Sequence, residues 1–149
     1  MAPKTYVGFV AEFPDDYDGG APAGFELAEF VSNQLRNLGY SVESPCDNEG
    51  WSWEFVTKST KFQVYTIVGL VGDTESDPPR QWLITNDSKP GIFKRLFGGN
   101  SVVREHEEFL TAFCEQIHLI IDSDDRFSHI AWYDSKTFDQ LNDQPSSTP

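Results

Sequence analysis

Carboxylates in two short segments are the first residues whose spacing suggests chemistry. The two sets are Asp73, Glu75 and Asp77, and Asp122, Asp124 and Asp125. The second set has the spacing that opens a calcium-binding loop, but Phe127 occupies the sixth position, where such a loop needs glycine. Loops can also bring two carboxylates together as in a hydrolase, yet no pair is distinguished by its neighbours. We therefore expect these acids to bind a partner and not a metal ion.

A second group of residues combines cations with the start of a helix. Lys94 and Arg95 precede two glycines, and Asn100 or Ser101 can cap the helix that is expected to follow. Free backbone N–H groups at a helix start, together with nearby cations, bind phosphate or carboxylate groups. An anion-binding site at these four residues is therefore the alternative hypothesis. The segment matches neither a P-loop nor a dinucleotide-binding fingerprint.

The remaining residue types give no pattern for catalysis or for a cofactor. The three histidines lack the i, i+4 spacing of a zinc-binding helix, and no serine lies in a Gly-x-Ser-x-Gly turn. Cys114 is expected to be a small buried hydrophobe, and the chain has no framework of paired cysteines. We expect no catalytic residue, no metal and no cofactor, so a non-enzymatic role is favoured over an enzyme.

Four tryptophans offer a stacking platform for a ring-shaped ligand as an alternative to core packing. They are Trp51, Trp53, Trp82 and Trp132. Each lies in a segment with apolar neighbours at a spacing of two, which is typical of a strand with one buried face. We therefore expect each of them to lie in the core, whereas exposure of two adjacent tryptophans would favour the platform.

The charge of the chain restricts its partners. It has 24 acids against 11 Lys and Arg residues, a formal net charge of -13. Nucleic acids and anionic membranes need clustered cations and are not expected as partners, whereas basic proteins are compatible with this charge. The lack of a disulfide framework, of a signal-peptide pattern and of a membrane-spanning apolar stretch favours a cytoplasmic protein, either monomer or homodimer.

Hydrophobic periodicity predicts the elements that position these residues. The longest helix is predicted over 101–121, where apolar residues recur at helical spacing. Another helix is predicted after Pro22, which suits a first helical position, and Gly39 is expected to end it in a left-handed conformation. Strands are predicted at 6–13, 40–43, 51–56, 62–71, 81–85 and 129–133, with a short terminal helix at 134–141.

The order β-α-β-β-β-β-α-β predicts an α+β domain. A mostly antiparallel sheet of five to six strands, with two helices on one face, is the simplest way to bury one apolar stripe on each helix. This order resembles a ferredoxin-like split βαβ with an added hairpin, a resemblance of topology that implies no function. A single domain is expected over 1–141, and the polar residues 142–149 are predicted to form a disordered tail.

The predicted topology separates the charges of the chain. A right-handed crossover makes the strands at 6–13 and 40–43 parallel, as is nearly always found within one sheet. The loops at 14–21, 45–50, 72–80 and 122–125 then lie at one end of the fold and hold 11 of the 24 acids, against the single base Arg80. Acids after the 101–121 helix oppose its dipole, which suggests that they serve an external partner.

These inferences combine into one functional expectation. We expect an acidic interaction protein, similar in composition to small inhibitors or immunity proteins of basic toxins, that binds a basic protein partner through its acidic end. The alternative is a small-molecule binder or enzyme that holds an anionic ligand at the start of the 101–121 helix. A dimer formed through an uncovered sheet face or edge is a third possibility.

Overall fold

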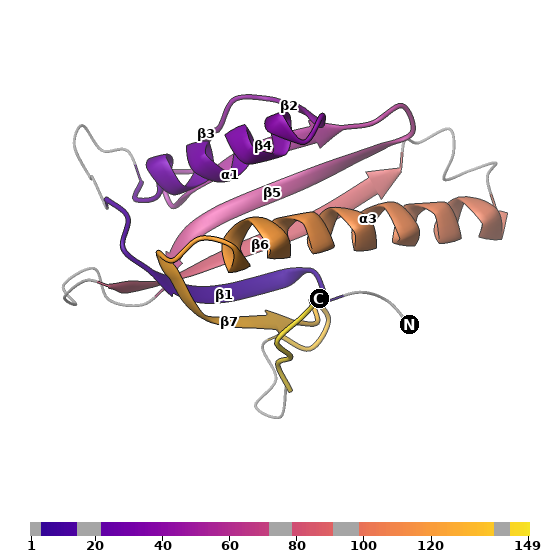
Figure 1. Ribbon diagram of the computed structural model, residues 1–149. Helices are drawn as coiled ribbons and strands as arrows, with labels where there is room; N and C mark the ends of the chain where they lie inside the picture. The colour runs from indigo at the N-terminus through magenta and orange to yellow at the C-terminus, as the bar shows by residue number, and fades with distance from the viewer. Residues whose placement is uncertain (1–3, 15–21, 72–78, 91–98, 139–143) are drawn as a thin grey trace.

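Seven antiparallel strands form one sheet, and two helices cover one face of it (Figure 1). The computed structural model describes residues 4–14, 22–71, 79–90, 99–138 and 144–149, with the backbone alone at 89–90 and 99–102. The elements are β1 (Tyr6–Ala11), α1 (Phe25–Asn37), β2 (Ser41–Val42), β3 (Cys46–Asn48), β4 (Ser52–Lys58), β5 (Phe62–Val71), β6 (Arg80–Pro90), α3 (Gly99–Asp122) and β7 (Phe127–Tyr133). The predicted α+β fold is confirmed, with seven strands in place of five to six.

The strand order is β2-β4-β5-β6-β1-β7, and β3 pairs with β4 as well. Every neighbouring pair is antiparallel, so the path from β1 through β6, β5 and β4 to β2 leaves β1 and β2 pointing in the same direction. These two strands are connected through α1 and separated by the other three, which makes a split βαβ unit with an inserted hairpin. The strands predicted at 6–13 and 40–43 were expected to be parallel, and the corresponding strands β1 and β2 are parallel in the structure.

The element order differs from the predicted one by an extra strand. The predicted loop at 45–50 contains β3, whose residues pair with Ser52, Trp53 and Glu54 of β4. Asp and Asn are rare in strands, so this pairing could not be read from propensity. For the same reason β6 was expected to end at 85, whereas its polar residues 86–90 pair with 62–66 of β5.

The first helix is set by a glycine at each end. Gly24 is its N-cap with φ 105°, so the helix begins at Phe25 and not at Pro22 as predicted. At the other end Gly39 has φ 98°, and the N–H of Tyr40 donates to the carbonyl of Leu35 at 3.1 Å. This is the left-handed stop that the sequence predicted.

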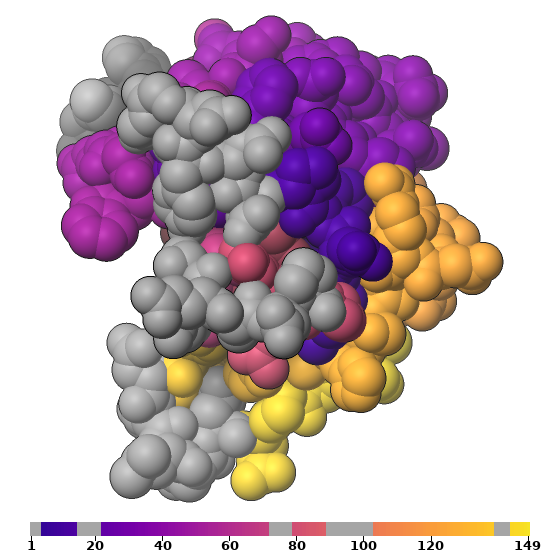
Figure 2. Space-filling view, turned by 90° about the vertical axis from the view of Figure 1, so that its left-hand side faces the viewer, coloured from indigo at the N-terminus to yellow at the C-terminus, as the bar shows by residue number. Residues whose placement is uncertain are grey.

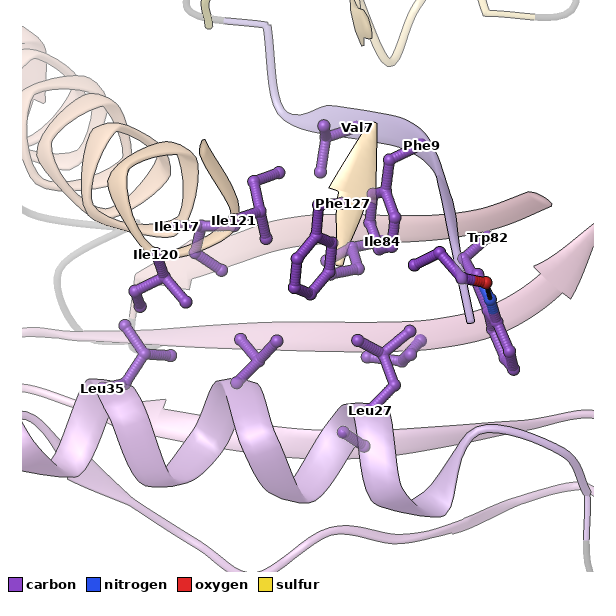
Figure 3. Packing of buried hydrophobic residues seen from close by; sticks show 14 of the residues in the cluster. Val7, Phe9, Leu27, Leu35, Trp82, Ile84, Ile117, Ile120, Ile121 and Phe127 are labelled. Atoms are coloured by element: carbon purple, nitrogen blue, oxygen red, sulfur yellow. Dashed lines mark hydrogen bonds between the residues drawn. The ribbon is translucent and has the colours of Figure 1, made fainter. Parts of the chain in front are cut away.

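The core lies between the two helices and the covered face of the sheet. Leu35 of α1 lies opposite Ile117 of α3, while Leu27, near the start of α1, lies closer to Ile84 of β6 and Phe127 of β7 (Figure 3). The first four of these side chains are fully buried, and each such side chain contributes roughly 1.5–3 kcal/mol by leaving water. The amphipathic helix predicted at 101–121 is thus the element that closes the core.

A buried polar network links β5 and β6 to Thr5, the residue that precedes β1. The Thr66 hydroxyl donates to the side-chain oxygen of Asn86 at 2.9 Å, and the Asn86 amide donates to the carbonyl of Thr5 at 3.0 Å. All three residues are buried, so sliding β5 or β6 by one residue would leave polar groups unpaired in the core.

The C-terminal residues pair with the edge of the sheet. Ser146 forms an antiparallel bridge with Trp132, and the carbonyl of Gln144 accepts a hydrogen bond from Lys4 Nζ at 2.6 Å. Both contacts fall within residues 142–149, for which a disordered tail is predicted. The short helix predicted from Asp134 is instead a turn over 135–138 in the described residues. Within the described chain, no helix has both the length and the apolar character needed to cross a membrane.

Candidate functional site

The strand directions bring several turns together at one end of the molecule. β1 and β5 end there, β4, β6 and β7 begin there, and so does α1, while α3 finishes at the same end (left in Figure 1, facing the viewer in Figure 2). We call it the acidic end, because the described charged residues there are mostly carboxylates. They are Glu12, Glu26, Asp47, Glu49, Asp122, Asp124 and Asp125, with the bases Arg80 and Arg126.

The turn between β3 and β4 presents an aromatic side chain to solvent at this end. Glu49 and Gly50 both have positive φ, 55° and 78°, which matches the twist of a tight hairpin. The turn is closed by a hydrogen bond from the N–H of Trp51 to the carbonyl of Asn48 at 3.2 Å. A second bond runs from the N–H of Gly50 to a carboxylate oxygen of Asp47 at 2.7 Å. This fixed turn leaves Trp51 84% exposed.

The expectation that all four tryptophans lie in the core is wrong for Trp51, whose side chain is exposed. Trp82 and Trp132 are buried as predicted, and Trp53 is half-buried. The Trp53 indole N–H donates to the carbonyl of Pro22 at 2.8 Å, and its ring lies 4.9 Å from that of Phe25. Trp51 differs because the chain turns at Glu49 and Gly50, so that Trp51 precedes the strand and does not share its buried face.

A charged cluster connects the acidic end to the core. Asp124 accepts two hydrogen bonds from the Arg126 guanidinium, at 3.1 Å from Nε and 2.9 Å from Nη2. The guanidinium carbon also lies 4.7 and 4.6 Å from the ring centres of Phe13 and Phe30. These hydrogen bonds hold the pKa of the Asp124 carboxyl below its usual range. Asp124 therefore has a structural role, whereas Asp122 and Asp125 are exposed.

The cations at the opposite end are partly neutralised by acids on neighbouring elements. Lys58 lies 2.7 Å from a carboxylate oxygen of Glu43, and Lys61 lies 3.1 Å from one of Glu105. The bond to Glu43 raises the pKa of Lys58. Both pairs are about half exposed, so they contribute little to stability.

Several predicted site residues lie outside the described part of the chain. Asp73, Glu75 and Asp77 of the acidic set, and Lys94 and Arg95 of the anion-binding set, belong to such segments. Asn100 and Ser101 fall in the first turn of α3, where only the backbone is described. The anion-binding site therefore stays a prediction, and of the partner-binding set the structure brings together Asp122, Asp124 and Asp125.

The two cysteines differ in their surroundings. Cys46 of β3 is exposed, whereas Cys114 of α3 is buried under the sheet. Burial raises the pKa of the Cys114 thiol to about 12, with a smaller effect from Glu115, so this thiol is inert as a nucleophile. Among the described residues, no group of three or more His, Cys, Asp or Glu side chains is placed to hold a metal ion.

The exposed tryptophan is the feature that sequence reasoning missed. The alternation of Trp51, Trp53 and Phe55 indicated one strand face, but the preceding Asn48-Glu49-Gly50 is a turn signal. Giving that signal priority would have moved Trp51 into the turn. No family model matches the chain, and neither a curated protein nor a solved structure is significantly similar to it, so the chemistry of its surface carries the functional argument.

Proposed function

We propose that the protein is a non-enzymatic interaction protein, of the inhibitor or immunity type, that binds a basic protein partner through its acidic end. The observation that carries the proposal is Trp51, 84% exposed on a hydrogen-bonded turn beside Asp47 and Glu49. Tryptophan is enriched among the few interface residues that carry most of the binding energy, and truncating such an anchor typically costs about 2 kcal/mol or more. The two hydrogen bonds fix the backbone that carries the ring, so less backbone freedom is lost on association.

The charge around Trp51 determines which partner fits. Asp122 and Asp125 add exposed carboxylates at the same end, and the nearby Arg126 is occupied by Asp124. A surface with one sign of charge accelerates encounter with a partner of opposite sign and disfavours partners of like sign. The charge therefore supplies speed and selectivity, while the aromatic ring supplies affinity.

Affinity capture with matched variants tests the proposal. The immobilised protein is incubated with native extracts, and the captured proteins are identified and their charge is recorded. We expect basic proteins to be recovered, and Trp51→Ala and the pair Asp122→Asn with Asp125→Asn each to reduce recovery several-fold. Leu119→Ala, at a site 57% exposed on α3, and the pair Glu107→Gln with Glu108→Gln are the controls. Recovery that is equal in the variants and their controls would contradict the proposal.

The alternative, an anion-binding protein or enzyme with its site at the start of α3, keeps one supporting observation. The first turn of α3 contains no acidic residue. Acids there stabilise a helix through its dipole, so their omission leaves the positive end of α3 open to an external anion. This observation is weaker than the exposed tryptophan, because many helices lack an acid in their first turn.

A further inference from the structure

The face of the sheet opposite the two helices contains an apolar groove among the described residues. One cross-strand row on this face consists of Gly69, Leu83, Gly8 and Ala131, from β5, β6, β1 and β7. Three of these four residues are small, so the groove has its floor at Gly8 and Ala131, and Tyr133 borders it. A Cβ atom added at Gly8 would lie 3.6 Å from Cε2 of Tyr133, an ordinary contact distance. A methyl group at Gly8 would therefore occupy part of the groove without displacing its walls.

An irregular residue lies at the edge of this groove. His129 lines it with φ 56°, in the left-handed region that few residues other than glycine adopt and that histidine tolerates better than most. The pairing of β1 with β7 shifts register between Gly8 and Val10, next to this position. Irregularities of this kind re-aim a side chain out of the normal alternation of a strand. Here the irregularity helps to keep an exposed ring beside the groove.

The size of the groove decides between two kinds of occupant. Its volume is about 170 Å³, and it is open to solvent on one side. Small-molecule sites usually have roughly 300–1,000 Å³ and enclose most of their ligand. A groove below that range fits a single aromatic or branched aliphatic side chain, whose remaining binding energy comes from the surface around it.

The position of the groove indicates which protein would supply that side chain. It extends to Val71 and Gln81, at the end of β5 and the start of β6, and so reaches the acidic end. Its described lining residues include no Lys, Arg, Asp or Glu. An uncharged groove that continues into a carboxylate-rich end is complementary to a basic segment with one apolar residue.

We propose that this groove receives one aromatic anchor side chain from the basic protein that binds the acidic end. The inference rests on the proposed function, because it takes the same partner and adds a second contact to Trp51. The acidic end and the groove then have different roles in binding. The acidic end attracts the partner, and the groove fixes its orientation by accepting a single ring.

Two synthetic peptides of lysine and glycine test the inference, one with a central tryptophan and one with alanine in its place. Binding is followed through the backbone amide signals of the labelled protein by NMR. We expect both peptides to shift signals at the acidic end. The tryptophan peptide should also shift Gly8, Leu83 and Ala131 and bind about tenfold more tightly. Gly8→Val, or the smaller Gly8→Ala if valine prevents folding, should remove that advantage.

The control substitution is Gly69→Val when Gly8→Val is used, and Gly69→Ala when Gly8→Ala is used. Gly69 lies in the same cross-strand row, with 3.6 Å between an added Cβ and that of Ser52, but outside the groove. A tryptophan advantage that survives filling at Gly8, or that never appears, overturns the inference and leaves the proposed function standing. Failure of both peptides to bind overturns both. If the groove signals shift when only the protein concentration is raised, a second copy of the chain occupies the groove. That result also overturns the inference.

Discussion

The hydrogen bond between His118 and Trp132 gives the sharpest test of how α3 is fastened to the sheet. Trp132 of β7 is fully buried, and its indole N–H donates to Nδ1 of His118 at 3.0 Å. The proton of the neutral His118 ring is therefore on Nε2. Replacing His118 with leucine keeps apolar bulk on α3 but leaves the indole N–H without an acceptor in the core.

The expected cost follows from that orphaned donor. Leaving a buried N–H unpaired costs roughly 1–3 kcal/mol, and the leucine adds little helix preference in return. His118→Asn is the matched control, because the asparagine side-chain oxygen is as far along the side chain as Nδ1 of histidine and can accept the same bond. We expect His118→Leu to lower the midpoint of thermal unfolding by about 2–12 °C, and His118→Asn to lower it by clearly less.

A double-mutant cycle separates this bond from general packing. Trp132→Phe removes the donor, so adding His118→Leu in that background should cost at least about 1 kcal/mol less than in the original chain. The measurement is urea unfolding of the four proteins, followed by tryptophan fluorescence and by circular dichroism. An equal cost in both backgrounds would refute the reasoning, because it would show that the histidine contributes through its shape alone.

Two further predictions concern the acidic end and the end of α1. Asp124 has a lowered pKa, so its bond to Arg126 adds stability that is present above the ordinary carboxyl pKa and lost as pH falls through the lower folded value. We expect Asp124→Asn to be less stable than the original chain by no more than about 1 kcal/mol at neutral pH, given its exposure, with the difference shrinking below about pH 4 in urea titrations. A difference that grows on acidification would contradict this. Gly39→Ala should cost roughly 1 kcal/mol in thermal unfolding, because Gly39 has φ 98° with open space around it. Gly69→Ala, in a strand, should be neutral or stabilising, and an equal loss in both variants would exclude a conformational cause.

The elements that could be predicted from the sequence are those whose own side chains determine their period. β5 has the predicted bounds, Phe62–Val71, because alternating side chains point into the core along its length. The helix predicted at 101–121 is α3, with ends one or two residues further out. In both segments the spacing of the apolar residues matches the face that is buried. The segment's own sequence is therefore sufficient to predict the element.

The elements that could not be predicted depend on a distant partner. β3 and the second half of β6 consist of polar residues, and they are strands because β4 and β5 offer free backbone groups beside them. Asn86 resembles a turn residue in sequence, yet its buried amide is paired with Thr66 and Thr5. No local pattern indicates such partners, since they come from segments 20 and 81 residues away.

In the candidate site, too, the positions of the acids could be predicted from the sequence but their roles could not. The roles decide which acids are suitable for a binding test. Strand directions predicted from the sequence placed Asp122, Asp124 and Asp125 at one end, but not what each does there. The structure uses the carboxylates of Asp47 and Asp124 as hydrogen-bond acceptors within the chain. The exposed Glu49, Asp122 and Asp125 have no such bond within the described residues. Removing charge from the first pair therefore changes stability together with charge, whereas removing it from the exposed acids changes charge alone. Substitutions at the exposed acids are therefore the ones that test whether charge at the acidic end attracts a partner, because they do not also disturb the fold of that end.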